Sequence, residues 1–537
     1  MIAGGGGVRI ADTDPVTETV TPPGDANLYA VLRAAWTERL DAVFLRLADG
    51  SVVTYGEIDD WSARVAAVLH EAGVVEGDRV VAQIAKTPSA VALYFGCLRV
   101  GAVYVPLNEA YTFDEVAYFI GDARPVLIVA APGRDVPADG IRVMTVDQDG
   151  GGTLADLVVA APARAERATM AGRTAAMLYT SGTTGKPKGA MLTTENLASN
   201  ATALAALWGF TADDVLLHAL PIFHVHGLFI ALHCAMLRGC EVRFLPRFDV
   251  AAVRSSLIGS TVMMGVPTFY SRLLADQSFC AVECASMRLF ISGSAPLTQA
   301  VHHAFTERTG HRILERYGMT ETGMISSNPL VGERIAGTVG FALPDVAIRV
   351  VDESGTACPV GSVGVVEVAG PNVFAGYWRM PDKTSASFRA DGFFVTGDLG
   401  SLGEDGRLTL SGRGTDLIIS GGLNIYPKEI ELLLDGVDGV VESAVIGVTH
   451  PDLGDGVVAV VVIDDGDGGG DGNGEGDAGQ HPHAEAIVAA IRVTLDARLA
   501  RFKHPKHIVV VADLPRNAMG KVERAALRQT YADVFMS

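Results

Sequence analysis

A short segment rich in hydroxyl, glycine and lysine residues carries the clearest chemistry in the sequence. Residues 178–192 read LYTSGTTGKPKGAML, and the residues suited to phosphate binding are Thr180, Ser181, Gly182, Thr183, Thr184, Gly185, Lys186 and Lys188. Glycines let the backbone approach an anion, hydroxyls and amides donate hydrogen bonds, and lysines supply positive charge. The segment therefore predicts a loop that binds a polyphosphate.

The spacing in this loop differs from that of a Walker A motif, which requires GxxxxGK[ST]. Thr180 stands at the first glycine position, and Pro187 follows Lys186 where Ser or Thr is needed. A surface turn is the alternative explanation, although turns ordinarily carry fewer hydrogen-bond donors. We therefore predict a nucleotide-binding loop of another class.

Four further segments combine residues that suit nucleotide binding. They are RYGMTET at 316–322, TGD at 396–398, GRGTDLIISGGLNIYPKEIE at 412–431 and PRNAMGK at 515–521. Tyr317 can stack on a purine, Thr320 offers a hydroxyl to a phosphate, and Glu321 is a hard oxygen ligand suited to Mg²⁺. Asp398 can accept two ribose hydroxyls, although an isolated turn aspartate is usually a cap.

These five segments, in this order, resemble those of the adenylate-forming superfamily of acyl-CoA synthetases, firefly-type luciferases and peptide-synthetase adenylation domains. The resemblance covers nearly everything after about residue 28. It implies that ATP and a carboxylic acid form an acyl-adenylate, which is then passed to coenzyme A. Any single segment is moderately specific, whereas five in order are very specific.

The resemblance also implies roles for individual residues. Glu321 is the implied magnesium ligand, Asp398 and Arg413 the ribose contacts, and Lys521 the catalytic lysine between the acid and the α-phosphate. Further ATP contacts are implied at Ser292, Gly293, Glu315, Arg316 and Gly318. A mobile lysine would offset the charge of a pentavalent phosphorus, although most lysines are simply exposed on the surface.

Asp416 lies where the sequence changes from a large domain to a small one. The resemblance implies that Asp416 is the hinge about which the small domain rotates, and hinges need only a few residues that absorb backbone rotation. Gly421 and Gly422 resemble the segment that faces the pantetheine tunnel of coenzyme A. An ordinary tight turn is the alternative for these two glycines.

The identity of the acid is indicated by segments 219–229, ALPIFHVHGLF, and 264–274, MGVPTFYSRLL. His224 and His226 lack the third ligand that a catalytic zinc needs, whereas the resemblance places His224 near the substrate carboxylate. Together with MRLFISGSAPL and ERYGMTETGM, these segments are most similar to malonyl-CoA synthetases. They predict a dicarboxylic acid.

A second carboxylate needs a cation, because a buried unpaired charge is very costly. Arg272 stands in an otherwise apolar helical segment, and a planar guanidinium suits bidentate carboxylate binding. The resemblance pairs Arg272 with Ser294, and Arg288 is the second candidate. A surface arginine is the alternative for Arg272. Met324 is expected to form a wall of the acyl pocket.

Short apolar runs such as 79–84 and 126–130 alternate with helical patterns such as 58–71. This alternation predicts an α/β fold with largely parallel sheets. The expected divisions are a disordered leader at 1–27, a large N-terminal adenylation domain at 28–415 with a β-barrel-like subdomain at about 337–415, and a small mobile α+β C-terminal domain at 416–537 with a flexible insert at 464–483.

Composition excludes several function classes. The formal charge of 42 − 62 = −20 disfavours nucleic-acid binding, which needs clustered Lys and Arg. No signal peptide and no apolar stretch of ~20 residues is found, so we expect a cytoplasmic protein without a membrane span. The six cysteines lack zinc spacing and are expected to be buried free thiols. Oligomeric state is not indicated.

The sequence therefore predicts a malonate–CoA ligase that uses ATP, Mg²⁺ and coenzyme A and releases AMP and pyrophosphate. A ligase for methylmalonate or another short-chain acid shares every feature except the pocket residues. A P-loop kinase or GTPase would instead release ADP or GDP. A catalytically silent binding protein would lack Lys521 and Glu321.

Overall fold

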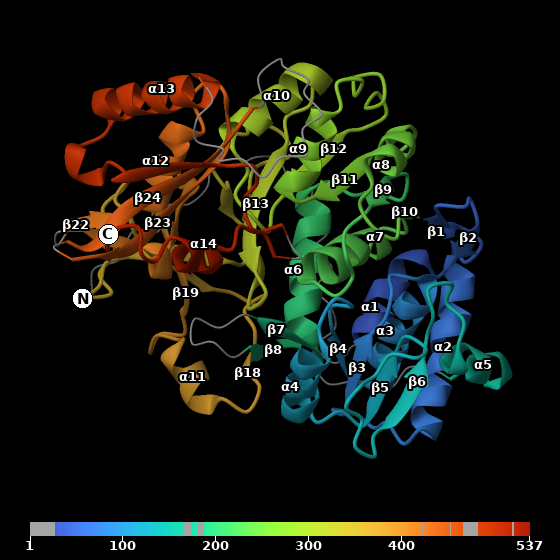
Figure 1. The fold of residues 1–537 in the computed structure, drawn as a ribbon. Helices are drawn as coiled ribbons and strands as arrows, with labels where there is room; N and C mark the ends of the chain where they lie inside the picture. The colour runs from blue at the N-terminus through green and yellow to red at the C-terminus, as the bar shows by residue number, and fades with distance from the viewer. Residues whose placement is uncertain are drawn as a thin grey trace, which may run out of the picture.

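The computed structural model of the protein describes residues 27–164, 173–180, 187–420, 423–451, 453–464, 482–517 and 520–536. Almost all of the expected leader and almost all of the expected flexible insert lie outside these described residues. In Figure 1 the blue N-terminal elements lie at the lower right, the green elements above them, and the orange and red C-terminal elements at the upper left.

The first sheet places six parallel strands side by side. Its order is β15-β14-β13-β12-β11-β9-β10-β1-β2, and the strands from β13 to β1 are parallel. The bounds are β1 Val43–Leu47, β2 Val52–Thr54, β9 Val215–His218, β10 Glu241–Phe244, β11 Val262–Gly265, β12 Leu289–Ser292, β13 Leu314–Met319, β14 Gly323–Ser327 and β15 Phe341–Ala342. Ligands of such sheets bind at the carboxyl ends of the strands, where His218 and Ser292 lie.

The second sheet has the order β18-β8-β7-β4-β3-β5-β6, with β7 to β6 parallel. The bounds are β3 Arg79–Gln83, β4 Val103–Pro106, β5 Leu127–Ala130, β6 Arg142–Thr145, β7 Thr174–Thr180, β8 Lys188–Thr193 and β18 Gly376–Tyr377. Because β7 and β8 pair antiparallel, the predicted phosphate loop connects two neighbouring strands.

Two further sheets follow along the chain. The third is antiparallel and contains β16 Ala347–Val351, β17 Gly364–Ala369, β19 Phe394–Leu402 and β20 Leu408–Arg413. The fourth contains β21 Ile418–Ser420, β22 Leu423–Ile425, β23 Val440–His450, β24 Gly454–Ile463 and β25 His507–Val511. It has its own apolar core, built largely from valine and isoleucine, so its strands do not depend on the first two sheets for burial.

The helices begin at clear signals. Thr54 and Glu57 form a capping box at α2, and Thr112 and Glu115 form another at α4, which satisfies backbone donors at each helix start. The α-helices are α1 Leu28–Arg33, α2 Tyr55–Glu71, α3 Pro88–Val100, α4 Phe113–Ala123, α5 Thr153–Ala160, α6 Thr194–Leu207, α7 His233–Met236, α8 Val250–Leu257, α9 Pro267–Ala275, α10 Gln299–Thr309, α11 Pro381–Ala386, α12 Pro427–Leu434, α13 Pro482–Arg498 and α14 Arg524–Thr530. Three 3₁₀ helices are described, η1 Ala34–Trp36, η3 Gly414–Asp416 and η4 Arg501–Lys503, and η2 His226–Leu232 is a π-helix.

The predicted fold class is confirmed. The expected strands at 79–84 and 126–130 correspond to β3 and β5, and the expected helix at 58–71 corresponds to α2. The π-helix was not predicted, because its apolar sequence does not distinguish it from an α-helix. The prediction of buried cysteines was wrong for Cys280, which is exposed, and for Cys358, which is half-buried. Among the described helices, none is long and apolar enough to cross a membrane.

Arg288 anchors the start of β12 rather than facing a substrate. Its Nε and Nη2 donate to the two carboxylate oxygens of Asp214, each at 2.7 Å, and Nη1 donates to the Trp208 carbonyl at 3.0 Å. The Asp214 side chain is 3% exposed. Burial tends to raise the pKa of Asp214, but the bonds from Arg288 and Thr261 prevail and lower it. Arg288 is therefore a structural residue.

Replacing Arg288 with methionine should lower the free energy of unfolding by about 3 kcal/mol, because Asp214 would stay buried without its guanidinium. Urea denaturation followed by circular dichroism measures the change. The control is Arg46→Met, which breaks the more exposed Arg46–Glu241 pair and should cost less than about 1 kcal/mol. Equal losses in the two variants would contradict this account.

Candidate functional site

The predicted site residues gather where the C-terminal turn meets the first sheet. The turn is a short hairpin in which Arg516 bridges Val522, and the Arg516 guanidinium pairs with Glu442 of β23. A Cβ added to Gly520 would lie 3.0 Å from Oγ1 of Thr268, at the start of α9. The turn that carries Lys521 is therefore docked against α9.

Lys521 lies in the electric field of several predicted site residues. Burial and the Arg413 charge lower the pKa of Lys521, and the charges of Asp398, Arg316 and Glu321 also act on it. The Lys521 side chain is nevertheless exposed to solvent. The docked turn thus brings the predicted catalytic lysine into contact range of the nucleotide-binding residues.

The predicted ribose contacts, Asp398 of β19 and Arg413 of β20, meet Tyr317 of β13, the residue predicted to stack on the purine. Arg413 Nε lies 2.9 Å from Asp398 Oδ1, and the Tyr317 hydroxyl donates a short hydrogen bond to Oδ2. Burial raises the pKa of Asp398, while the Arg413 charge opposes that shift. The β19–β20 pairing sets Asp398 opposite Arg413, which explains why residues 15 positions apart meet.

Glu321 lies in the turn between β13 and β14 and is 7% exposed. The Tyr377 hydroxyl donates to Glu321 Oε1 at 3.0 Å, and the Thr180 hydroxyl contacts the same atom at 3.4 Å. Among the described residues neither contact uses Oε2, so this oxygen is free to bind a hard cation. Glu321 therefore fits the predicted magnesium ligand, and Tyr377 is a neighbour that the sequence motifs did not indicate.

The phosphate loop is described only at its two ends. Thr180 ends β7 and Lys188 begins β8, whereas Ser181, Gly182, Thr183, Thr184, Gly185 and Lys186 lie outside the described residues. The Lys188 ammonium lies 5.4 Å from the centre of the Tyr377 ring, and burial followed by the Lys383 charge lowers the pKa of Lys188. Both ends thus converge on Glu321 and Tyr377.

Glu315 is a buried acid at the same strand ends. Its Oε1 accepts the backbone N–H of Gly337 at 2.9 Å, and burial raises the pKa of Glu315 to about 8. The Lys428 charge opposes this shift. At neutral pH the carboxyl is therefore largely protonated and can donate a hydrogen bond. Thr320 lies in the turn between β13 and β14, which holds it beside Glu321.

Arg316 is a buried cation without an anionic partner in the described part of the chain. It is 3% exposed, and neither its Nε nor its Nη2 has a hydrogen-bond partner there. A Cβ added to Gly293 would lie 2.4 Å from the guanidinium carbon, so only glycine admits Arg316 at this position. Burial lowers the pKa of Arg316 to about 9. The guanidinium therefore has unused donors for an anionic ligand.

Two histidines and a serine lie beside Arg316. The Oγ of Ser294 is 3.3 Å from Nδ1 of His226, and Nε2 of His226 is another buried atom without a described partner. Burial and the Arg316 charge lower the pKa of His226. Burial and the Lys521 charge lower the pKa of His224 to about 3. Both imidazoles are neutral at physiological pH and can accept or donate hydrogen bonds.

Ser292, at the end of β12, likewise has a buried hydroxyl without a hydrogen-bond partner among the described residues. Met324 is buried on β14, and a Cβ added to Gly318 would lie 2.8 Å from its Cε. Arg272 is exposed on α9, one turn after Thr268, and no hydrogen bond or ion pair joins it to another described residue. Residues four apart share a helix face, so Arg272 lies on the side of α9 that the Lys521 turn covers.

The expected hinge residue is held by an ion pair. Asp416 lies in η3, and its Oδ1 is 2.6 Å from Nη2 of Arg528 in α14. Helix α14 packs against β23, so the pair ties the hinge to the fourth sheet. Gly421 and Gly422, the expected tunnel residues, lie outside the described residues.

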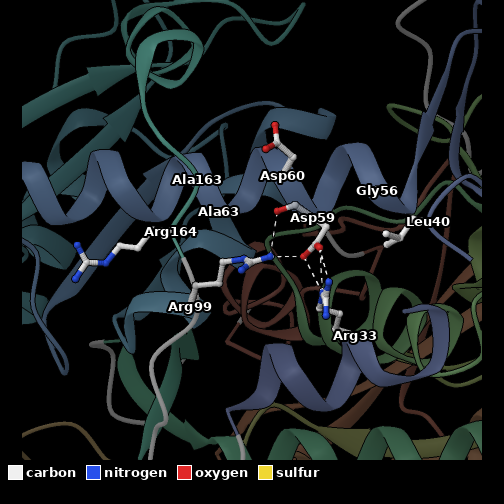
Figure 2. Close-up of a pocket in the computed structure, with 9 residues that line it drawn as sticks. All are labelled: Arg33, Leu40, Gly56, Asp59, Asp60, Ala63, Arg99, Ala163 and Arg164. Atoms are coloured by element: carbon white, nitrogen blue, oxygen red, sulfur yellow. Dashed lines mark hydrogen bonds and ion pairs between the residues drawn. The ribbon is translucent and has the colours of Figure 1, made fainter. Parts of the chain in front are cut away.

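A separate surface cavity of about 360 Å³ lies among α1, α2, α3 and the segment after α5. Figure 2 shows that Arg33 and Arg99 from two of these helices both point at the Asp59 carboxylate. The Arg33–Asp59 distance is 2.8 Å. The two guanidinium groups share this carboxylate. The cavity is therefore lined by a structural ion-pair network and is not the predicted reaction site.

Comparisons with known proteins agree with the prediction of a nucleotide-binding site. The family described as AMP-binding enzyme matches residues 32–378, and its C-terminal domain matches residues 429–521. The malonate–CoA ligase of Arabidopsis thaliana is 31% identical, covering 94% of this chain and 89% of that protein. The indoleacetate–CoA ligase of Aromatoleum aromaticum is 33% identical, covering 89% of this chain and 93% of that protein.

One solved structure is similar to this chain over nearly its whole length. ATP-bound MatB from Rhodopseudomonas palustris is 48% identical and has a TM-score of 0.88, covering 95% of this chain and all of that one. The chain therefore belongs to the AMP-binding enzyme family. Within that family it is an acid–CoA ligase of the AMP-forming type.

Replacing Lys521 with alanine should lower acid-dependent pyrophosphate release by about 10²- to 10³-fold, as expected when a positioned charge is lost. Because the pKa of Lys521 is lowered, wild-type activity should fall as the pH rises. This fall should begin below the ordinary pKa of a lysine side chain. Lys521→Arg should move that fall to higher pH, because a guanidinium stays protonated.

The control for Lys521 is Lys506→Ala, which removes an exposed lysine of the same region. Stopped assays of pyrophosphate release from pH 6 to about 10 compare the three variants with the wild type. Unchanged activity in Lys521→Ala would refute the role of Lys521, provided that Lys506→Ala is also unchanged.

Proposed function

We propose that the protein is a malonate–CoA ligase, which forms malonyl-CoA from malonate, ATP and coenzyme A through malonyl-AMP. The observation that carries the proposal is the buried Arg316, whose Nε and Nη2 have no described hydrogen-bond partner. A buried guanidinium left without an anion costs several kcal/mol. A ligand that carries a second carboxylate would supply that anion, whereas a simple monocarboxylic acid would not.

The charges around Arg316 support a diacid. Lys521 adds a second cation, while the low pKa values of His224 and His226 keep both imidazoles neutral. Ser294 adds a hydroxyl beside His226. A site with two cations and neutral hydrogen-bonding groups suits a substrate with one carboxylate for the reaction and another for recognition.

Arg316 replaces Arg272 as the first candidate for the distal carboxylate. Arg272 is exposed and lies on the site-facing side of α9, so it can reach an acid that enters the site. Arg316 is buried and needs no rearrangement, which makes its hydrogen bonds to a carboxylate stronger. We propose that both arginines bind the diacid and that Arg316 contributes more.

The reaction follows from the positions of the chain's own residues. A malonate oxygen attacks the α-phosphorus of ATP and pyrophosphate leaves, while the Lys521 ammonium stabilises the developing negative charge. Asp398 and Arg413 hold the ribose, and the Tyr317 hydroxyl donates a hydrogen bond to the Asp398 carboxylate. The coenzyme A thiol then attacks the acyl carbonyl, AMP leaves, and the thiol proton passes to solvent. Rotation about Asp416 would expose the adenylate to this thiol beside Gly421 and Gly422.

Mg²⁺ would neutralise charge on the ATP phosphates when bound. Glu321 would hold it through Oε2, because Oε1 already accepts the Tyr377 and Thr180 hydroxyls. The Tyr377 bond fixes the orientation of the carboxylate. No other described residue is assigned to the ion.

A panel of acids tests the proposal. AMP formation with coenzyme A should be fastest for malonate among malonate, methylmalonate, succinate, acetate and propionate. In Arg316→Met, kcat/KM for malonate should fall about 100-fold, since losing a partner of a buried charge costs about 3 kcal/mol. Arg272→Met should show a smaller fall in the same direction.

Propionate turnover is the matched control, because propionate lacks the second carboxylate. Its kcat/KM should change far less than that of malonate in both variants. Equal loss for both acids in Arg316→Met would assign this residue to ATP or to the reacting carboxylate instead. Faster turnover of an aromatic acid than of malonate would favour the indoleacetate ligase's substrate class.

Removing the metal ligand should change the metal requirement of the reaction. In Glu321→Gln, the Mg²⁺ concentration that gives half-maximal pyrophosphate release should rise at least about tenfold, because a neutral amide binds a hard cation more weakly than a carboxylate. Tyr377→Phe should produce a smaller rise. An unchanged Mg²⁺ dependence in Glu321→Gln would remove this residue from the metal site.

A further inference from the structure

Lys86 connects the two large sheets beside the site. It lies between β3 and α3 in the second sheet, but its Nζ reaches the end of β9 in the first sheet. There Nζ lies 2.9 Å from the His218 carbonyl oxygen and 2.7 Å from Nδ1 of the His218 ring. The Phe244 ring centre is 4.4 Å away, so three groups of the first sheet surround the ammonium.

The two hydrogen-bond partners of His218 determine its tautomer. The Gly227 carbonyl oxygen lies 2.9 Å from Nε2 and only accepts, so the ring proton lies on Nε2. Nδ1 then accepts a hydrogen bond from Nζ of Lys86 at 2.7 Å. Lys86 and Gly227 therefore hold the imidazole at its two nitrogens.

The His218–Gly227 bond closes the loop that carries the site histidines. Residues 218–227 leave β9, pass through His224 and His226, and enter the π-helix η2. A Cβ on Gly227 would lie 2.0 Å from the Pro221 carbonyl oxygen, so the closed loop admits only glycine there. A shift of this bond would move His226, which contacts Ser294.

Lys86 is half-buried, and holding its positive charge at this position costs free energy. No described carboxylate forms an ion pair with it, and burial lowers its pKa well below the ordinary value. Burial and the Lys86 charge likewise lower the pKa of His218. Such costs persist where a group has a function, since a neutral residue would otherwise be more stable.

We infer that Lys86 is a positioning residue for acid activation, acting through His218 to hold the loop 218–227 and thereby His224 and His226. The inference rests on the proposed place of these two histidines in the acyl site. It does not depend on which acid is the natural substrate. The loop defines the wall against which the acid packs, so its displacement should affect the acid more than ATP.

Three variants test the inference with whichever acid the wild-type enzyme turns over fastest. Lys86→Met keeps the apolar stem but removes the donors, and His218→Phe keeps a ring but removes both hydrogen bonds. KM for the acid should rise at least about tenfold in each, with KM for ATP within about twofold of wild type. The double variant should lose no more than His218→Phe alone, because Lys86 acts through His218.

The pH profile separates positioning from simple stability. The titratable groups that face His218 are Lys86 and His226. Without the Lys86 charge the pKa of His218 rises, so the acid side of the kcat/KM profile should move to higher pH in Lys86→Met. His218→Phe lacks the titrating ring and should show no such movement.

Lys506→Met is the control and should match the wild type in every measurement. If Lys86→Met does not fold, Lys86→Gln replaces it with the same expectations. The inference is overturned if the Lys86 variants change only the melting temperature, or if KM rises equally for acid and ATP. Multiplying losses in the double variant would also overturn it, since the two residues would then act separately. An absence of malonate turnover in the wild type would refute the proposed substrate but leave this comparison intact.

Discussion

A buried guanidinium that has no anionic partner among the described residues is the constraint around which the proposed acyl site is built. Arg316 can occupy its position only because Gly293 has no side chain. Its charge lowers the pKa of His226 and contributes to the lowered pKa of Lys521. The lowered pKa values of His224, His226 and Lys521 thus depend first on burial and then on neighbouring positive charges, of which Arg316 is one. The binding of an anion would relieve the cost of burying it.

The rest of the site is assembled from segments that are distant in sequence. Lys521 arrives on a C-terminal hairpin that touches Thr268, and the pairing of β19 with β20 brings Arg413 to Asp398. Lys86 joins the second sheet to the first through His218. The Lys521 and Lys86 contacts join parts of the chain that fold around different sheets, whereas β19 and β20 are neighbours within the third sheet. Catalytic geometry therefore depends on how these sheets are placed against one another.

Many candidate site residues could be predicted from the sequence because their chemistry is local. A run of hydroxyls, glycines and lysines binds phosphate wherever the backbone turns, and Asp398 or Glu321 can be identified from motifs a few residues long. The choice between arginines could not be made in this way. Arg272, Arg288 and Arg316 all stand near apolar residues in the sequence. Arg272 is exposed, Arg288 pairs with Asp214, and Arg316 is buried without an anionic partner in the part of the chain that the structure describes.

The sequence by itself determined the fold class, the order of the nucleotide-binding motifs and the family, because periodicity and short motifs depend on neighbouring residues. Tertiary structure alone decided which cations lack a partner, which histidines are neutral and which lysine positions the loop after β9. These properties depend on burial and on charges contributed by residues far away in the chain. Desolvation and pairing act through space, and no local pattern records them.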